Sequence, residues 1–292
     1  MTNNIFLILK QLGLCTESSV TQFYPRVRDR EDIAVLRCAR SGVLFLSRTD
    51  HICEAHYTDM VSCDYWNVSD QREAQLTTAY DDVRRFDQFR TILTGKKWLD
   101  FGTGNGSLLE KMKPHALEAC AVELQTQMRN AHQANGFTCK ADVSEFNSGY
   151  FDVITLFHVF EHLLKPIETL KLLKSRLKPG GKIIIEVPHA EDALLSLYDI
   201  DAFKQFTFWS EHLILHTRTS ISRFLEEAGF SDINVSGFQR MPLSNHLYWL
   251  KKGLPGGHIA WNYLDSPALS GAYASSLAGI NKTDTLIACA TA

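Results

Sequence analysis

The stretch WLDFGTGNGSLLEKM, residues 98–112, joins an apolar run to three glycines and an amphipathic segment. The run up to Asp100 predicts a buried strand, and the segment after Gly106 predicts a helix. Glycine adopts backbone conformations that side chains disfavour and lets a ligand approach the main chain, so a glycine-rich turn between strand and helix indicates a binding crevice. The stretch therefore predicts an α/β fold with a ligand site at the carboxyl edge of its sheet.

Composition limits the classes of function. The chain has 292 residues, of which 45% are hydrophobic, with 30 basic and 33 acidic side chains. This near balance of charge does not favour nucleic acid as a partner. The first residues, MTNNIFLILKQLGLC, lack the basic lead-in of a signal peptide, and no apolar run is long enough for a membrane span. We expect a cytoplasmic protein with no integral membrane segment and a small-molecule substrate, and its oligomeric state stays open.

Strand and helix patterns alternate from about Lys96 onward. Short apolar runs, separated mostly by helical periodicity, predict a mostly parallel sheet, and TDTLIACATA at the end predicts an antiparallel closing strand. Pro166 opens a predicted helix, and TSISRFLEEAGF, residues 219–230, predicts another with Ile221, Phe224 and Leu225 inward. The predicted strands are KKWLDFG, EACAVEL, FTCKADV, FDVITLFH, GKIIIEVP and INVSGF.

Residues 1–76 are expected to form a small accessory lobe, and residues 77–292 the main domain, with an insertion at about 241–282. VLRCARSGVLFL, residues 35–46, predicts a hairpin, whereas HYTDMVSCDYWNV, residues 56–68, shows a mixed pattern. The insertion is rich in Trp, Tyr and Gly and predicts a lid or acceptor-binding element. The helix predicted over residues 79–93 would place five apolar side chains inward: Tyr80, Val83, Phe86, Phe89 and Ile92.

The glycine spacing argues against a dinucleotide. NAD and FAD motifs read G-x-G-x-x-G, whereas here Ser107 stands at the third glycine position. The carboxylate of Asp100 would repel phosphate and suits a cationic group instead. Glu123 ends the second strand, where a carboxylate can accept hydrogen bonds from two ribose hydroxyls. Asp142 ends the third, where its carboxylate and the N–H of Val143 can contact an adenine edge.

Together, the motif DFGTGNG and the acidic ends of the next two strands resemble the class I S-adenosylmethionine-dependent methyltransferases. The resemblance covers about residues 96–240 and the final strand. It implies a Rossmann-like sheet, S-adenosylmethionine as cofactor and S-adenosylhomocysteine as product. The implied cofactor-binding residues are Asp100, Gly102, Gly104, Gly106, Glu123, Asp142, Val143 and His158.

Three histidines follow predicted strands at the same edge. His158 and His162 flank Glu161 in HVFEHLLKP, and His189 follows the fifth strand. If the first segment is helical, His158 and His162 share a face. Histidine is the usual general base near neutral pH, and a resemblance to bacterial methyltransferases with an EH pair favours His162 over His158, and His158 over His189. Each of these rings has an alternative role in packing or in capping backbone groups.

The segment FTFWSEHLILHTRTS, residues 206–220, is expected to cover the acceptor. We predict that Trp209, His212 and His216, together with Phe208, line a substrate pocket. A packed loop-helix element is the alternative. The pattern EHLLKP…KPGGKIIIEVP resembles bacterial enzymes that modify surface polysaccharides or sugar nucleotides, which implies methylation of a polar acceptor, most often at oxygen.

Several alternatives stay open. A resemblance to quinone O-methyltransferases implies an aromatic hydroxyl as acceptor and a divalent cation at Glu161 and His162, although His158 replaces their further carboxylate. A catalytically inactive, cofactor-binding scaffold is a third reading. The seven cysteines form no C-x-x-C pair, which predicts reduced thiols, and Ser41 replaces the second cysteine of the C-x-x-C-G knuckle that CARSG resembles, so we expect no structural metal.

Overall fold

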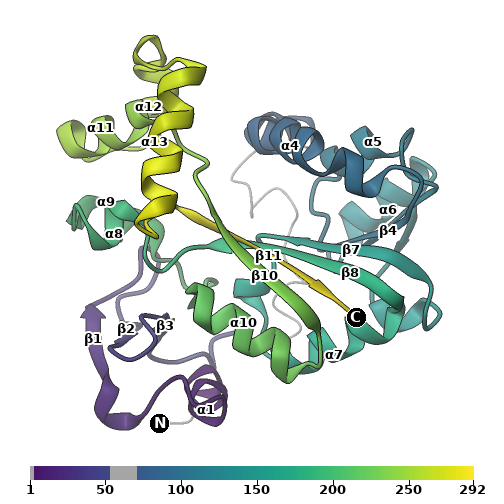
Figure 1. Cartoon of the computed structure of the whole chain (residues 1–292), viewed down its shortest axis with the longest axis horizontal. Helices are drawn as coiled ribbons and strands as arrows, with labels where there is room; N and C mark the ends of the chain where they lie inside the picture. Colours follow the sequence, from purple (N-terminus) through teal and green to yellow (C-terminus); the bar gives the residue numbers. More distant parts are fainter. Residues whose placement is uncertain (1–2, 53–70) are drawn as a thin grey trace.

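The structure is a computed structural model that describes residues 3–52 and 71–292, with side chains in the second range from Thr78 onward. A large mixed sheet carries helices on both faces, and a smaller antiparallel sheet lies beside it (Figure 1). The segment HYTDMVSCDYWNV lies outside the described residues. Within the described ranges, no helix has both the length and the apolar character needed to cross a bilayer.

The large sheet has seven strands in the order β10-β11-β8-β7-β4-β5-β6. Strands β4 to β8 run parallel to one another, and β11 runs antiparallel to both of its neighbours. The predicted mostly parallel sheet with an antiparallel closing strand is confirmed. Its strands are β4 (Lys97–Phe101), β5 (Glu118–Val122), β6 (Thr138–Lys140), β7 (Phe151–Phe157), β8 (Leu177–Pro188), β10 (Ser231–Phe238) and β11 (Thr285–Thr291).

The central strands are buried on both faces, which is why their sequences read as continuous apolar runs. In β8, Ile183, Ile184, Ile185 and Val187 are all almost fully buried. The indole N–H of Trp98 in β4 donates to Thr155 of β7 at 2.9 Å, so even the polar atom of this core side chain is satisfied. The parallel register brings the carboxyl ends of β4, β5 and β7 to one edge of the sheet.

Helices cover the two faces of the sheet (Figure 1). One face carries α4 (Gln71–Leu93), α5 (Ser107–Met112) and α6 (Thr126–Ala134), and the other carries α7 (Pro166–Arg176) and α10 (Arg218–Glu227). Pro166 is the first residue of α7, as predicted, where its missing N–H has no cost. The Thr217 hydroxyl caps α10, and Ile221, Phe224 and Leu225 face the core as predicted.

Helix α4 forms, and its predicted inward face is only partly right: Phe89 is buried and Phe86 packs against the core, but the other three side chains are largely exposed. Tyr80 is 56% exposed, Val83 49% and Ile92 40%. The buried positions include Asp82 and Arg85 as well as apolar side chains, among them Leu93. A pattern of apolar spacing cannot locate this face, because paired charges occupy part of it.

The N-terminal lobe is a four-stranded antiparallel sheet in the order β1-β2-β3-β9. The predicted hairpin is present as β2 and β3, and β9 comes from far along the chain, between β8 and α10. The Cys38 thiol lies 3.2 Å from Ser19 Oγ, and the Cys15 thiol lies 3.8 Å from Ser41 Oγ. The lobe comprises α1 (Asn4–Gln11), η1 (Glu17–Ser19), β1 (Val20–Tyr24), β2 (Val35–Cys38), β3 (Leu44–Leu46) and β9 (Ile214–Leu215).

A helical insertion separates β10 from β11 and projects away from the large sheet (Figure 1). It consists of α11 (Leu243–Lys252), α12 (Gly257–Ala260), η4 (Asn262–Leu264) and α13 (Pro267–Gly279). Two further short helices, α8 (Ala193–Ser196) and α9 (Asp201–Thr207), lie between β8 and β9. The predicted role of the insertion as a lid, and the predicted domain boundary at residues 76 and 77, stay predictions.

Candidate active site

A cavity of about 530 Å³ opens at the carboxyl edge of the large sheet. Its walls come from the ends of β4, β5, β6 and β7, from α4, and from the turn after β10. Open α/β sheets bind ligands at this place, because the connections leave a crevice there. The predicted site residues that line the cavity are Asp100, Gly102, Gly104, Glu123, Asp142, Val143, His158, His162 and His212.

The glycine turn has the backbone geometry that its sequence predicts. Gly102, Gly104 and Gly106 have φ angles of 75°, 58° and 76°, in the left-handed region that favours glycine. A side chain on Gly102 would meet Val159 at 2.6 Å. Gly106 does not line the cavity; it is the N-cap of α5 and packs against His132, where a side chain would clash at 2.3 Å. Two of the glycines thus face the ligand space, and the third serves the packing of the loop.

Two carboxylates stand at the ends of β4 and β5. Burial raises the pKa of Asp100 to about 6, and its Oδ1 accepts a hydrogen bond from Thr155 at 2.8 Å. Glu123 accepts hydrogen bonds from the N–H groups of Gly104, at 2.9 Å, and Gln125, at 2.8 Å. Burial also raises the pKa of Glu123, against the effect of these bonds. A cationic ligand group near Asp100 would lower the pKa of this carboxyl and favour its ionised form. The two carboxylates therefore fit the ammonium and the ribose hydroxyls of S-adenosylmethionine.

Asp142 has a structural role in addition to its place on the cavity wall. Its Oδ1 accepts the N–H of Ser144 at 2.6 Å and caps η2 (Val143–Glu145). This contact is the turn-capping role that aspartate often takes, and it leaves the carboxylate at the cavity. A buried Val143 lies beside it. The third strand end therefore supplies both a cap and a wall of the ligand space.

The segment after β7 is not an α-helix. His158 has a φ angle of 54°, and only η3 (Phe160–His162), a single 3-10 turn, follows it. Nδ1 of His158 lies 3.1 Å from Glu161 Oε1, while Nε2 lies 3.3 Å from Glu186 Oε1 and 3.1 Å from Nη1 of Arg240. Burial alone would lower the pKa of His158, but the hydrogen bonds to the two carboxylates raise it, against the charge of Arg240.

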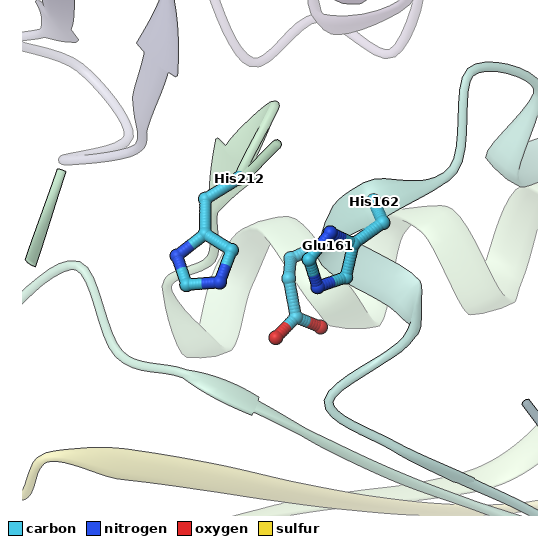
Figure 2. A group of neighbouring side chains, drawn as sticks. All are labelled: Glu161, His162 and His212. Carbon is cyan, nitrogen blue, oxygen red and sulfur yellow. The ribbon is translucent and has the colours of Figure 1, made fainter. Parts of the chain in front are cut away.

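Glu161, His162 and His212 lie close together (Figure 2), and the two histidines line the cavity. Each has a ligand-type atom within 4.8 Å of the others, and Glu161 is fully buried. Its Oε2 has no hydrogen-bond partner among the described residues. Despite burial, the hydrogen bond to His158 lowers the pKa of Glu161 to about 2. Burial lowers the pKa of His162, and that of His212 to about 3.

These protonation states give the cluster two chemical capacities. Neutral imidazole next to a carboxylate can accept a proton, because the carboxylate stabilises the imidazolium that forms. Two neutral imidazoles and one carboxylate are also a donor set for a divalent transition metal.

The structure does not bring the other predicted site residues to this cavity. His189 is buried, and its Nδ1 lies 2.8 Å from the Thr283 carbonyl. His216 is buried between Phe160 and Phe224. Trp209 contacts His162 and His212 edge-on but is not part of the cavity wall. The prediction that His189, Trp209 and His216 line the site is therefore wrong. His216 instead belongs to a packed element, which was the alternative prediction for this segment.

Phe208 is also a core residue, packed against Tyr24 of the N-terminal lobe.

Sequence reasoning missed the charged side of the cavity. Arg240, after β10, and Asp81 and Arg85 of α4 line it, and Glu186 of β8 lies behind them. Glu186 is fully buried, and although burial opposes the shift, neighbouring arginines and His158 hold its pKa well below the usual value. An acidic residue in the run IIIEVP was a usable signal, because a carboxylate in a strand that is buried on both faces needs a cationic partner.

Comparisons with known proteins agree with this geometry. The family model described as "Methyltransferase domain" matches residues 71–235. An S-adenosylmethionine-dependent methyltransferase from Archaeoglobus fulgidus superposes with a TM-score of 0.51 at 21% identity, covering 79% of this chain and 97% of that one. A second such enzyme, from Thermotoga maritima, gives 0.51 at 15% identity, covering 75% and 93%. At these identities the likeness concerns the fold.

Curated relatives match a shorter part of the chain. The ubiquinone biosynthesis O-methyltransferase of Idiomarina loihiensis is 26% identical over 166 residues, which cover 52% of this chain and 68% of that protein. The enzyme of the same name from Xanthomonas oryzae pv. oryzae is 25% identical over 123 residues, 39% of this chain, and the match spans only 52% of its length. Because the family match extends over more than half of the chain and the fold agrees, the chain belongs to the methyltransferase-domain family and has the class I fold.

Proposed function

We propose that the protein transfers a methyl group from S-adenosylmethionine to an oxygen atom of a polar small molecule. The observation that carries this proposal is the convergence on one cavity of the glycine turn, the acidic strand ends and two histidines, His162 and His212, which lie beside the buried Glu161. A cofactor site and a proton acceptor next to one another are what a methyltransferase needs, because the reaction depends on alignment and on removal of one proton.

The chain's own residues would hold the cofactor by backbone and carboxylate contacts. Gly102 and Gly104 leave the main chain accessible. Asp100 would face the cationic group of the cofactor, and Glu123 would offer carboxylate oxygens to its hydroxyl groups. Asp142 and Val143 stand farther along the same wall. When bound, S-adenosylmethionine supplies an activated methyl group on its sulfonium. The protein's remaining task is to orient the acceptor and deprotonate it.

His162 is the proposed general base. Burial lowers its pKa, so the ring is neutral at neutral pH and has a lone pair available. The ionised Glu161 carboxylate lies within 4.8 Å, and its negative charge would stabilise the ring after it accepts the acceptor's proton. His158, hydrogen-bonded to Glu161 Oε1, orients that carboxylate. The Arg240 and Asp81 side chains complete this polar wall.

The chemistry of the wall supports a polar acceptor. The cavity is lined by ionised or hydrogen-bonding groups, including Asp81, Arg85, Arg240 and His212, as well as by apolar side chains such as Leu163. Hydroxyl-rich molecules can form hydrogen bonds with such groups, whereas a flat apolar ring would leave them desolvated and poorly paired. A sugar or sugar nucleotide of surface-polysaccharide synthesis is therefore the acceptor class that we favour.

The test begins with calorimetric titration of S-adenosylhomocysteine, with NAD as the control. We expect saturable binding of S-adenosylhomocysteine alone, followed by transfer of labelled methyl to a nucleotide sugar in an acceptor screen with mass-spectrometric detection. Binding without transfer to any acceptor would favour a cofactor-binding scaffold, and binding of NAD alone would exclude the proposed cofactor.

A second candidate function is methylation of an aromatic hydroxyl with the help of a divalent ion. The specific observation behind it is the buried Glu161 oxygen that has no partner in the described chain, placed beside two neutral imidazoles. The curated relatives are named as ubiquinone biosynthesis O-methyltransferases, which agrees with this acceptor class. His212, brought in from the segment before β9, would be the third ligand of the ion.

Metal analysis separates the two candidates. The purified protein would be dialysed against a chelator, assayed, and then assayed again after addition of Mg²⁺, Mn²⁺ or Zn²⁺. If the chelator abolishes activity toward a catechol and added metal restores it, the aromatic candidate is favoured. The wild type should then also bind metal stoichiometrically, and His212→Ala should not. Activity toward sugars that is indifferent to the chelator would favour the first.

A further inference from the structure

Arg240 is a charged residue of the cavity wall that the proposed base mechanism does not use. It stands two residues beyond the end of β10, at the start of the helical insertion, and its side chain is 22% exposed. Strand β10 ends at the same edge of the sheet as β8, because both are antiparallel to β11. The side chain of Arg240 therefore extends from the last part of the sheet toward the end of β7.

Both the backbone and the guanidinium of Arg240 are fixed by carboxylates. Asp284 accepts hydrogen bonds from the N–H groups of Arg240 and Met241, each at 2.9 Å, and from the amide of Gln239 at 2.9 Å. The guanidinium Nε donates to Asp81 at 3.0 Å, and Nη2 donates to the second oxygen of the same carboxylate. This two-bond fork orients the plane of the guanidinium and leaves Nη1 directed elsewhere.

Nη1 of Arg240 lies 3.1 Å from Nε2 of His158. Arginine has donors only and stays protonated, so Nε2 of His158 accepts from Nη1 in the neutral ring, whereas in the charged ring Nε2–H faces Glu186 Oε1. In a neutral ring the proton then resides on Nδ1, which donates to Glu161 Oε1 at 3.1 Å. We propose that Arg240 is a positioning residue: it selects the Nδ1–H tautomer of His158 and so fixes the Glu161 carboxylate, which lies within 4.8 Å of His162 and His212.

Glu186 is the competing partner of Nε2, and the distances decide against it. Its Oε1 lies 3.3 Å from Nε2, farther than Nη1 of Arg240. Both of its oxygens already accept hydrogen bonds from Arg84, at 2.8 and 2.9 Å, and Arg85 adds a bond of 2.7 Å. Without Arg240, Glu186 would be the nearest acceptor, so a neutral ring would place its proton on Nε2 and lose the bond to Glu161.

The inference deepens the proposed function and rests on it for its effect on catalysis, but its structural part can be read without turnover. Protein labelled with ¹⁵N-histidine would be studied by long-range ¹H–¹⁵N spectroscopy, with the His158 signals assigned from His158→Gln. In the wild type, we expect the neutral ring to be protonated at Nδ1. In Arg240→Met, we expect the proton to move to Nε2.

Removing Arg240 alone breaks its pair with Asp81 and leaves Asp81 paired with Arg84, so Arg240→Met unbalances the charge of the cavity wall. The double variant Asp81→Asn, Arg240→Met removes both charges and is the primary test, with Arg223→Met on the exposed side of α10 as the matched control. Arg240→Lys keeps the charge but not the fork and should recover only part of the wild-type behaviour. The wild-type tautomer in the double variant would overturn the inference, as would an Nε2–H ring in the wild type.

Activity supplies the second readout. We expect kcat to fall about tenfold or more in the double variant, as is typical when a supporting hydrogen bond is lost, while the affinity for S-adenosylhomocysteine stays near that of the wild type. A change in KM alone would contradict a role in orienting the base. If no acceptor is methylated even by the wild type, the proposed function fails, while the tautomer measurement still decides the role of Arg240.

Discussion

The imidazole Nε2 of His132 lies 2.8 Å from the carbonyl oxygen of Gly104. His132 is fully buried on α6, and burial lowers its pKa, so the ring is neutral and Nε2–H can donate to the carbonyl. The same ring occupies the space where a side chain on Gly106 would stand. His132 thus holds the backbone of the glycine turn at Gly104 and leaves no room for a side chain at position 106.

Replacing His132 with alanine should therefore weaken cofactor binding although the residue does not line the cavity. Loss of one buried hydrogen bond is worth about 1–1.5 kcal/mol, which corresponds to roughly a tenfold rise in Kd for S-adenosylhomocysteine. Calorimetry would measure the change, with His115→Ala as the control. An unchanged Kd would mean that the turn keeps its geometry without this anchor.

Gly104→Val should abolish cofactor binding. The residue has a φ of 58°, a conformation that a β-branched side chain disfavours, and the new side chain would stand at the cavity wall. Titration with S-adenosylhomocysteine, after circular dichroism has established that the variant is folded, would give the result. Wild-type affinity in a folded variant would exclude the crevice as the cofactor site.

His162→Ala should reduce methyl transfer by a factor on the order of 10² to 10⁴, the usual contribution of a general base. The affinity for S-adenosylhomocysteine should stay nearly the same, because the proposed base acts on the acceptor and not on the cofactor. His189→Gln is the matched control, since His189 lies away from the cavity, and it should retain near-wild-type turnover. Full turnover in His162→Ala would remove His162 from the proposed role.

Asp192→Asn should stabilise the protein increasingly as the pH rises. Burial and the nearby charge of Asp284 raise the pKa of Asp192 to about 8, whereas an unfolded aspartate has a pKa of about 3.9. The folded state therefore binds the proton of Asp192 more tightly than the unfolded state does. The stability that this proton contributes is complete below about pH 4 and is lost as the pH rises toward 8. Asparagine can still accept the N–H of Leu194, which Asp192 binds at 2.7 Å, without this loss.

Denaturant unfolding across this pH range would measure the effect. The free energy of unfolding of the variant, relative to the wild type, should rise by at most about 1.4 kcal/mol per pH unit. Asp87→Asn, at an exposed position of α4, should show no such trend. A pH-independent difference for Asp192→Asn would show that this carboxyl is not protonated in the folded protein.

The sheet was predictable because its information is local. Trp98 to Gly106 encode a strand, a turn and a helix start within one stretch, and the apolar run of β8 identifies a buried strand without any knowledge of its neighbours. The acidic strand ends were predictable for a related reason: in a parallel sheet, residues at the ends of consecutive strands meet at one edge.

The charged half of the site was not predictable, because it depends on contacts between distant residues. Asp81 and Arg240 are separated by 159 positions, and Arg84 and Glu186 by 102. In sequence, Asp81 and Arg84 are ordinary polar residues of an amphipathic helix, which is why the inward face of α4 was assigned to Tyr80 and Val83. His189 was misplaced for a similar cause: it follows β8 at the correct edge, but a backbone carbonyl holds its ring away from the cavity.

Asp284 has a consequence for how this molecule can change during evolution. One carboxylate binds the backbone on the far side of the insertion, so the two ends of that segment stay together regardless of what lies between them. The entropic cost of closing a loop grows only slowly with its length. The length of the segment between Met241 and Asp284 can thus change at little entropic cost while the sheet, and the arginine beside His158, keep their positions. The contacts of Trp249 with Phe203 and of Tyr273 with Tyr198 limit what can replace its helices.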